Sequence, residues 1–328
     1  MEAAQNRLDN LTKPPGSLGY LEELAVKIAG ITNTKFPEVS NKVHLIMVGD
    51  HGVVAEGVSA FPQSVTKAMV KNFLNGGAAV NVLSRQHGVD ISIVDIGMVE
   101  KLKDKKLIQA NVKRSTNNIV NGPAMTKSEA VKGIEIGIKL TQELIKNGAD
   151  LIGTGEMGIG NTTPSSAIVA AVTDLSLKEV VGYGTGIDEE GLKNKKQVIQ
   201  KALEINQPNE NDGLEILHKV GGLEIAGMTG VMLAGAASRK PVLVDGLISG
   251  AAALIAYLIE PKVVNFLIPS HKSVEPGHGH LYEILDIRPM FDLDMRLGEG
   301  TGAILGMGIV ESAVRIIKEM ATFDSLEL

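Results

Sequence analysis

A glycine-rich stretch begins at residue 153 and reads Gly153-Thr154-Gly155-Glu156-Met157-Gly158-Ile159-Gly160-Asn161-Thr162-Thr163-Pro164. The apolar run from Asp150 to Gly153 leads into it, and helical spacing continues from Pro164 to Thr173. Thr163 is placed to cap this helix, because Thr is favoured at the N-cap and Pro at the first helical position. The stretch therefore predicts a strand, a glycine-rich loop and a helix in succession.

This loop has the features of a phosphate site. Backbone amides at the start of a helix attract anions, and glycines let a ligand approach the backbone closely. A tight turn needed only for packing would give the same pattern. Residues 153–158 also match the GxGxxG of dinucleotide-binding proteins. That match is weak, because no acidic residue follows at a strand end about 20 residues later to bind a ribose hydroxyl.

Short β-branched runs alternate with longer helical patterns along most of the chain. We expect strands at Val43 to Val48, Ile91 to Ile96, Asp150 to Gly153, Val242 to Val244 and Val263 to Ile268. We expect helices at Ser64 to Gln86, Lys127 to Asn147, Pro164 to Thr173, Glu189 to Glu204, Leu223 to Ala237 and Leu247 to Leu258. Apolar strands separated by helices predict an α/β fold, a three-layer, doubly wound, mostly parallel sheet that binds ligands at the carboxyl ends of its strands.

The two ends of the chain have a different pattern. Residues 1 to about 35 and about 283 to 328 are mostly helical in spacing, and a last helix is expected from about Gly302 to Met320. We therefore predict a small helical domain made of residues 1–38 and 284–328, and a large Rossmann-like domain of residues 39–283 that carries the phosphate loop.

Composition narrows the function. The chain has 328 residues, a formal net charge of -6, no cysteine and no tryptophan. Without a basic run or aromatic platforms, nucleic acid is not an expected partner. The absence of cysteine excludes disulfides, thiolate catalysis and sulfur-bound zinc. The first residues lack the pattern of a signal peptide, and no apolar run approaches the roughly 20 residues needed to span a bilayer, so we expect a cytoplasmic protein.

A second glycine-rich stretch places one carboxylate, Glu299, between glycines in Arg296-Leu297-Gly298-Glu299-Gly300-Thr301-Gly302. A helix start at this point would stabilise the ionised form, whereas apolar neighbours would raise the pKa of Glu299 and make it a base. It could equally be a first-turn glutamate that only complements the helix dipole. The sequence is consistent with both interpretations.

Two histidine-containing segments follow predicted strands. His271, His278 and His280 lie in one stretch, but their spacing fits no common zinc motif, so we expect a loop that closes over an anion with Lys272, Ser273 and backbone amides. The turn at residues 50–52, Asp-His-Gly, either faces a ligand or uses Asp and Gly only to end the preceding strand.

Taken together, these segments resemble the nicotinate-nucleotide:dimethylbenzimidazole phosphoribosyltransferase family. The matching blocks run in the family's order over nearly the whole chain and are Lys13-Pro14-Pro15-Gly16-Ser17-Leu18-Gly19, Asp50-His51-Gly52-Val53, Asn117-Asn118-Ile119, Gly155-Glu156-Met157-Gly158, Asn161-Thr162-Thr163-Pro164, Ile205-Asn206-Gln207-Pro208-Asn209, Val220-Gly221-Gly222, Gly227-Met228-Thr229-Gly230, Ile268-Pro269-Ser270-His271 and Met295-Arg296-Leu297-Gly298-Glu299-Gly300. The family commonly has a longer segment before the first block, so a helix of the small domain is expected to be missing or trimmed.

The resemblance implies a reaction in the nucleotide-loop branch of cobalamin biosynthesis. Nicotinate mononucleotide and 5,6-dimethylbenzimidazole give α-ribazole 5′-phosphate and nicotinate, with inversion at C1′ and with no cofactor or metal. Glu299 is implied as the general base and Glu156 as a second carboxylate that positions the reacting groups. The implied nucleotide and phosphate residues are Met157, Gly158, Ile159, Gly160, Asn161, Thr162, Lys195, Ser273 and Gly298. The family is dimeric, so a homodimer is expected.

The positions that align with the family's base pocket are Phe61, Met69 and Leu297. Some relatives carry polar residues at the positions of Phe61 and Met69, so we expect a more apolar pocket that tolerates other benzimidazoles, purines or phenols, although either side chain could instead be ordinary core. Two alternatives remain. A non-catalytic nucleotide- or azole-binding protein would have no use for Glu299. An NAD-dependent oxidoreductase would need an acidic residue to bind the ribose hydroxyl, and that residue is missing.

Overall fold

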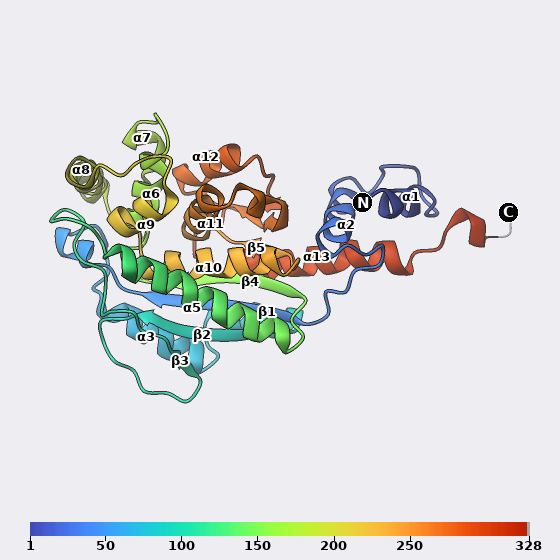
Figure 1. Cartoon of the computed structure of the whole chain (residues 1–328), viewed down its shortest axis with the longest axis horizontal. Helices are drawn as coiled ribbons and strands as arrows, with labels where there is room; N and C mark the ends of the chain where they lie inside the picture. The colour runs from blue at the N-terminus through green and yellow to red at the C-terminus, as the bar shows by residue number, and fades with distance from the viewer. Residues whose placement is uncertain (327–328) are drawn as a thin grey trace.

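The computed structural model describes residues 1–326 and contains a six-stranded sheet in which every paired strand is parallel. The strand order is β3-β2-β1-β4-β5-β6 (Figure 1). The strands are β1 (Lys42–Gly49), β2 (Val89–Gly97), β3 (Leu107–Gln109), β4 (Leu151–Met157), β5 (Val242–Val244) and β6 (Leu267–Pro269). The order reverses between β1 and β4, and ligands bind at such a point in open α/β sheets.

Helices cover both faces of the sheet, which confirms the predicted three-layer α/β fold. Side chains alternate along β1, so that Leu45 and Met47 join one core while Ile46 and Val48 join the other. The first core contains residues of α5 (Lys127–Lys146), α6 (Thr162–Ala171), α8 (Glu189–Asn206), α9 (Gly213–Val220), α10 (Leu223–Ala237), α11 (Leu247–Ile259) and α12 (Pro276–Leu285). The second contains residues of α1 (Glu2–Asp9), α2 (Tyr20–Thr32), α3 (Ser64–Leu74), α4 (Ala79–His87) and α13 (Thr301–Glu319).

Shorter elements complete the chain. They are the helix α7 (Leu177–Val180), the 3₁₀ helices η1 (Gly52–Glu56), η2 (Pro261–Phe266) and η3 (Phe323–Ser325), and a two-stranded sheet of β7 (His271–Lys272) and β8 (Phe291–Asp292). No helix within residues 1–326 is both long and apolar enough to cross a membrane.

Four local predictions are wrong. The helix expected from Ser64 to Gln86 is two helices, because residues 75–78 break it and Gly76 has a left-handed φ of 76°. The strand expected from residue 263 begins only at β6, because Pro261 and a hydrogen bond from the Lys262 amide to the Glu260 side chain start η2 instead. Within residues 283–328, expected to be mostly helical, residues 286–300 contain only the short strand β8.

The expected cap of α6 is also different. The helix already includes Thr162 and Thr163, and its N-cap is Asn161, which makes no side-chain capping bond. The Asn161 amide donates instead to Glu156, so the residue before the helix is used inside the site rather than to cap it.

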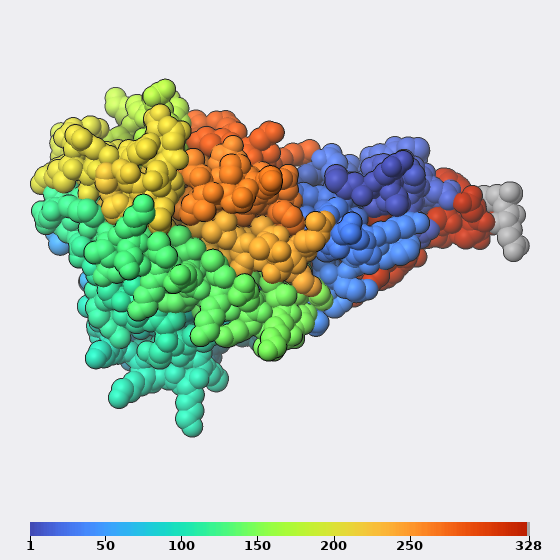
Figure 2. Space-filling view, viewed as in Figure 1, coloured from blue at the N-terminus to red at the C-terminus, as the bar shows by residue number. Residues whose placement is uncertain are grey.

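The terminal segments meet at one end of the molecule. The Arg7 guanidinium donates to the carbonyl oxygens of Ile317 and Met320 at the end of α13, at 3.2 and 2.8 Å. Figures 1 and 2 show α1, α2 and the second half of α13 projecting from the main body. On this packing we propose that residues 1–38 and 284–328 form the small domain and residues 39–283 the large one, with α13 shared between their cores.

Candidate active site

A cavity of about 710 Å³ lies at the carboxyl ends of β4, β5 and β6. Most of the residues expected at the site line it: Phe61, Met69, Glu156, Met157, Gly158, Ile159, Asn161, Thr162, Ser273, Leu297, Gly298 and Glu299. The remaining two, Gly160 and Lys195, are not among its lining residues. The structure therefore brings the two glycine-rich segments, about 140 residues apart in the chain, to one cavity, as parallel-sheet topology requires.

Glu156 is the last buried residue of β4. One carboxylate oxygen, Oε1, accepts the Glu299 backbone amide at 3.3 Å, and the other accepts the Asn161 side-chain amide. Burial raises the pKa of Glu156 to about 8, and the Glu224 and Asp245 carboxylates add to the effect. Together the two contacts join the β4 loop, Met157 to Thr162, to the segment that carries Glu299.

Glu299 lies just before α13 rather than in its first turn, because the helix begins at Thr301. Its φ is 63°, between Gly298 at 83° and Gly300 at 82°, so three successive residues are left-handed. A non-glycine residue in this region stores strain, which is common at functional sites. The segment also needs glycine for space, since a Cβ on Gly298 would lie 2.3 Å from Oε1 of Glu156.

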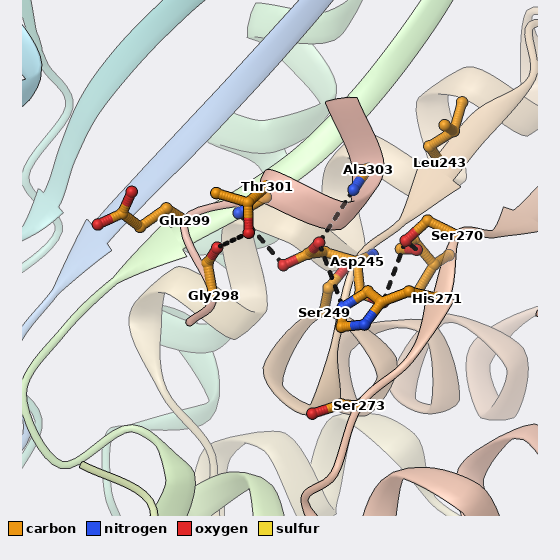
Figure 3. A network of polar contacts seen from close by, with 12 residues as sticks. Leu243, Asp245, Ser249, Ser270, His271, Ser273, Gly298, Glu299, Thr301 and Ala303 are labelled. Carbon is orange, nitrogen blue, oxygen red and sulfur yellow. Dashed lines mark hydrogen bonds and ion pairs between the residues drawn. The ribbon is translucent and has the colours of Figure 1, made fainter. Parts of the chain in front are cut away.

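The Glu299 carboxylate faces away from the start of its own helix. Figure 3 shows its side chain pointing away from Asp245. Burial raises the pKa of Glu299 to about 7, while the Val80 amide in the first turn of α4 opposes the rise. The Oε2 atom is buried and has no hydrogen-bond partner within residues 1–326. The interpretation as a first-turn glutamate that complements its own helix is therefore wrong.

Asp245 follows β5 and holds the start of α13 (Figure 3). It accepts the backbone amides of Gly300 at 3.2 Å and Ala303 at 3.0 Å, and the His271 Nε2 atom lies 3.7 Å from its Oδ1. Burial raises the pKa of Asp245 against the opposing effect of His271. Asp245 was not among the predicted site residues, although it directly follows a predicted strand, where ligand-binding residues lie in such folds.

The β4 loop offers fewer backbone amides than expected, because the Ile159 amide donates to Thr66 Oγ1 at 3.1 Å and the Asn161 amide to the Gly158 carbonyl at 3.1 Å. Side chains contribute instead. The buried Lys195 ammonium, on α8, donates to Thr162 Oγ1 at 2.8 Å from behind the loop. Burial lowers the pKa of Lys195 to about 8.

Arg296, which was not among the predicted site residues, is a cationic side chain at the cavity wall. Its Nη1 donates to the Gly184 carbonyl at 3.2 Å. The Gly184 amide in turn donates to Glu275 Oε1 at 3.0 Å, which ties this wall of the cavity together. Ser273 also lines the cavity, but its backbone amide donates to His278 Nδ1 at 2.9 Å.

Several other candidate residues lie outside the cavity. Lys272, expected to close over an anion, lines a separate surface depression instead, because it lies on β7 with its neighbour His271 facing the opposite way. His51 is buried against Glu224, with Nε2 at 2.9 Å from Oε1, and does not line the cavity. His280 pairs with Glu283 on the surface. Within residues 1–326, no three His, Asp or Glu side chains are arranged to bind a metal ion.

The mouth of the cavity is apolar. Phe61 and Leu297 are 50% and 59% exposed there, and Met69 and Val65 of α3 line the same side. An apolar mouth and a polar floor with carboxylates, Arg296 and the β4 loop suit a ligand that carries both a ring and an anionic group.

The cavity lies at the strand ends of an open α/β sheet, where enzymes of this fold class bind their ligands. Residues 1–327 match the family model described as phosphoribosyltransferase. The chain is similar to the nicotinate-nucleotide–dimethylbenzimidazole phosphoribosyltransferase of Desulforamulus reducens, at 54% identity over 98% of this chain and 93% of that protein, and to that of Halalkalibacterium halodurans, at 52% identity over 98% and 90%. It is also similar to the crystal structure of CobT from Thermus thermophilus, with a TM-score of 0.95 and 42% identity over 98% of this chain and 97% of that one. The chain belongs to the nicotinate-nucleotide–dimethylbenzimidazole phosphoribosyltransferase family.

Proposed function

We propose that this chain transfers the ribose 5-phosphate of nicotinate mononucleotide to 5,6-dimethylbenzimidazole and releases nicotinate and α-ribazole 5′-phosphate. The observation that supports this most directly is that Glu299 and the β4 loop line one cavity and are joined through the Glu299 amide and the Glu156 carboxylate. A ribosyl carbon bound in this cavity can lie between a base and a phosphate site. We place the reaction in the cytoplasm.

Glu299 is the general base in this mechanism. One benzimidazole nitrogen uses its lone pair to form a bond to C1′ while the bond from C1′ to the pyridinium nitrogen breaks. The electrons of the broken bond stay on that nitrogen, so nicotinate leaves with a neutral ring and its carboxylate. The proton on the other benzimidazole nitrogen passes to the Glu299 carboxylate. A pKa of about 7 is well suited to this step, because a base is most effective when its pKa is near the working pH. Attack from the face opposite nicotinate inverts C1′.

Glu156 positions the reacting groups and stabilises positive charge. It already binds the Glu299 amide, so it fixes the catalytic segment against the β4 loop. Positive charge on the pyridinium and on the ribosyl group in the transition state favours the ionised carboxylate, against the burial that raises the pKa of Glu156 to about 8 in the free protein. No metal is required, because no pyrophosphate leaves.

The 5′-phosphate is bound by the β4 loop from Met157 to Thr162, together with Ser273 and Gly298. Lys195 contributes from behind through Thr162, and Arg296 supplies a further cation at the cavity wall. Phe61, Met69 and Leu297 form the base pocket at the apolar mouth. The pocket tolerates other benzimidazoles, purines or phenols because its contacts are apolar rather than hydrogen bonds.

The protein acts as a homodimer in this proposal. The exposed apolar side chains Phe61 and Leu297 at the cavity mouth support it, since such groups commonly mark an interface. A partner subunit at this position would add donors to the site. Sedimentation analysis of the purified protein tests this point, and a strictly monomeric, fully active protein would contradict it.

The reaction itself is tested by mixing the purified protein with nicotinate mononucleotide and 5,6-dimethylbenzimidazole and following nicotinate release by chromatography. The expected result is stoichiometric nicotinate and α-ribazole 5′-phosphate, lost in Glu299→Gln. Nucleotide binding without nicotinate release would favour a binding protein instead. Full activity in Glu299→Gln would remove this residue from the mechanism.

A further inference from the structure

His44 lies within β1, directly beneath the segment that carries Glu299. The side chain is completely buried, at 0% exposed, and shares its face of the strand with the apolar residues Ile46 and Val48. Its Nε2 atom is 3.1 Å from the backbone carbonyl oxygen of Glu299. A histidine at such a position requires a polar partner, and this carbonyl is the partner it has.

Three glycines make the space for the imidazole. In the sheet, His44 pairs with Gly153 and Ile46 pairs with Gly155 on the neighbouring strand β4. A Cβ on Gly153 or Gly155 would lie 2.5 or 2.4 Å from a ring nitrogen, and one on Gly300 would lie 2.0 Å from the ring carbon Cε1. The first two glycines are those of the apparent GxGxxG match. Their steric role is to admit a ring, not a dinucleotide.

The neutral imidazole of His44 has one N–H group, and the Glu299 carbonyl oxygen is its acceptor. Burial lowers the pKa of His44 to about 4, so the ring is neutral near neutral pH and carries a single N–H. A carbonyl oxygen can only accept, so Nε2 is the protonated nitrogen. The Nδ1 atom is buried and has no hydrogen-bond partner in the described part of the chain. The His44 ring therefore donates its N–H to the Glu299 carbonyl oxygen.

With the bond from His44, both the N–H and the carbonyl group of the Glu299 backbone are hydrogen-bonded. Its N–H donates to Glu156 Oε1 at 3.3 Å, and its carbonyl accepts from His44 Nε2 at 3.1 Å. The residue is left-handed, with φ of 63°, a conformation that persists only when its surroundings fix it. Rotation of either adjoining peptide would swing the side chain away from the cavity.

We propose that His44 is a positioning residue that fixes the catalytic carboxylate of Glu299 by hydrogen-bonding its backbone carbonyl from strand β1. This inference rests on the proposed function for its catalytic consequence, but not for its structural one. His44 does not line the cavity, so it touches neither substrate and acts only through Glu299.

Three variants of His44 distinguish the loss of the hydrogen-bond donor from a change in side-chain volume. His44→Gln places an amide nitrogen at about the reach of Nε2 and keeps the bond. The methionine of His44→Met has a similar length but no hydrogen-bond donor. The asparagine of His44→Asn has a donor, but its side chain is too short to reach the Glu299 carbonyl. We expect kcat to fall roughly ten- to a hundredfold in His44→Met and His44→Asn, because displacement of a catalytic group by about 1 Å has effects of this size. His44→Gln should stay within about threefold of the parent.

Two readouts distinguish positioning from a general loss of folding. The KM for nicotinate mononucleotide should stay within about twofold in all three variants, because Met157 to Thr162, which supply most of the proposed phosphate contacts, are unchanged. The acidic limb of the pH profile should move to lower pH in His44→Met, since a loosened segment exposes Glu299 to water. Glu156, Asp245 and the start of α4 also face Glu299, and they are the same in every variant.

Hydrogen–deuterium exchange of a peptide that covers residues 296–301 gives a measurement that needs no activity. Exchange should accelerate in His44→Met and His44→Asn but not in His44→Gln. Parent-like exchange and kcat in His44→Met would overturn the proposal, as would equal losses in all three variants that follow their thermal stability. A parent protein that releases no nicotinate would refute the proposed function, while the exchange result would still decide the role of His44.

Discussion

The pH dependence of Glu299 gives the sharpest test of the mechanism. With a pKa of about 7 in the free protein, Glu299 is about one-tenth ionised at pH 6 and about nine-tenths ionised at pH 8. A carboxylate with an ordinary pKa near 4.5 would be almost fully ionised at both. If the ionised form is the base, its contribution to kcat/KM should rise about tenfold between pH 6 and pH 8.

The assay compares the parent with Glu299→Gln at each pH. Because the substrate phosphate and the benzimidazole also titrate in this range, the useful quantity is the ratio of the two kcat/KM values, in which those titrations cancel. The ratio should reach roughly 10² to 10⁴ at pH 8, which is the usual contribution of a general base, and should be about tenfold smaller at pH 6. A ratio that does not change with pH would refute the assignment of Glu299 as a base with a raised pKa.

Three further predictions concern the rest of the cavity. Lys195→Met should raise the KM for nicotinate mononucleotide by about tenfold, since a charge-assisted bond behind the phosphate loop is lost, and steady-state kinetics with a lowered kcat at unchanged KM would contradict this. Gly298→Ala should lower stability to urea by about 1–2 kcal/mol and reduce kcat, because the residue is left-handed and its Cβ would meet Glu156. Phe61→Ala and Met69→Ala should change the order in which competing bases are used, measured with paired bases in one reaction, and an unchanged order would assign both side chains to simple packing.

The architecture was predictable because its signals are local. Alternating strands and helices, each bounded by turn residues, predicted the parallel sheet, and Val242 to Val244 and Leu223 to Ala237 have the expected bounds. The errors arose where local chemistry overrides periodicity. Gly76 divides an otherwise continuous helical pattern, and Pro261 begins a 3₁₀ helix inside an apolar run that resembles a strand.

The site was predictable only in part, for a physical reason. Strand ends meet at one edge of a parallel sheet, so a carboxylate after β4 and a segment before α13 could be assigned to one cavity from the pattern and the resemblance together. Asp245, Arg296 and His44 act through contacts with residues distant in sequence. No spacing along the chain encodes that Gly153 and Gly155 leave room for a ring on another strand.

Helix α13 connects the terminal helices to the segment that carries Glu299. It has 19 residues and is about 28 Å long, with the catalytic segment at one end and the hydrogen bonds from Arg7 at the other. Its buried side chains belong to one continuous core that includes Ile46 and Val48 of the central strand. Because the terminal helices, α13 and one face of β1 share this core, we expect the terminal helices and the segment that carries Glu299 to unfold in one transition.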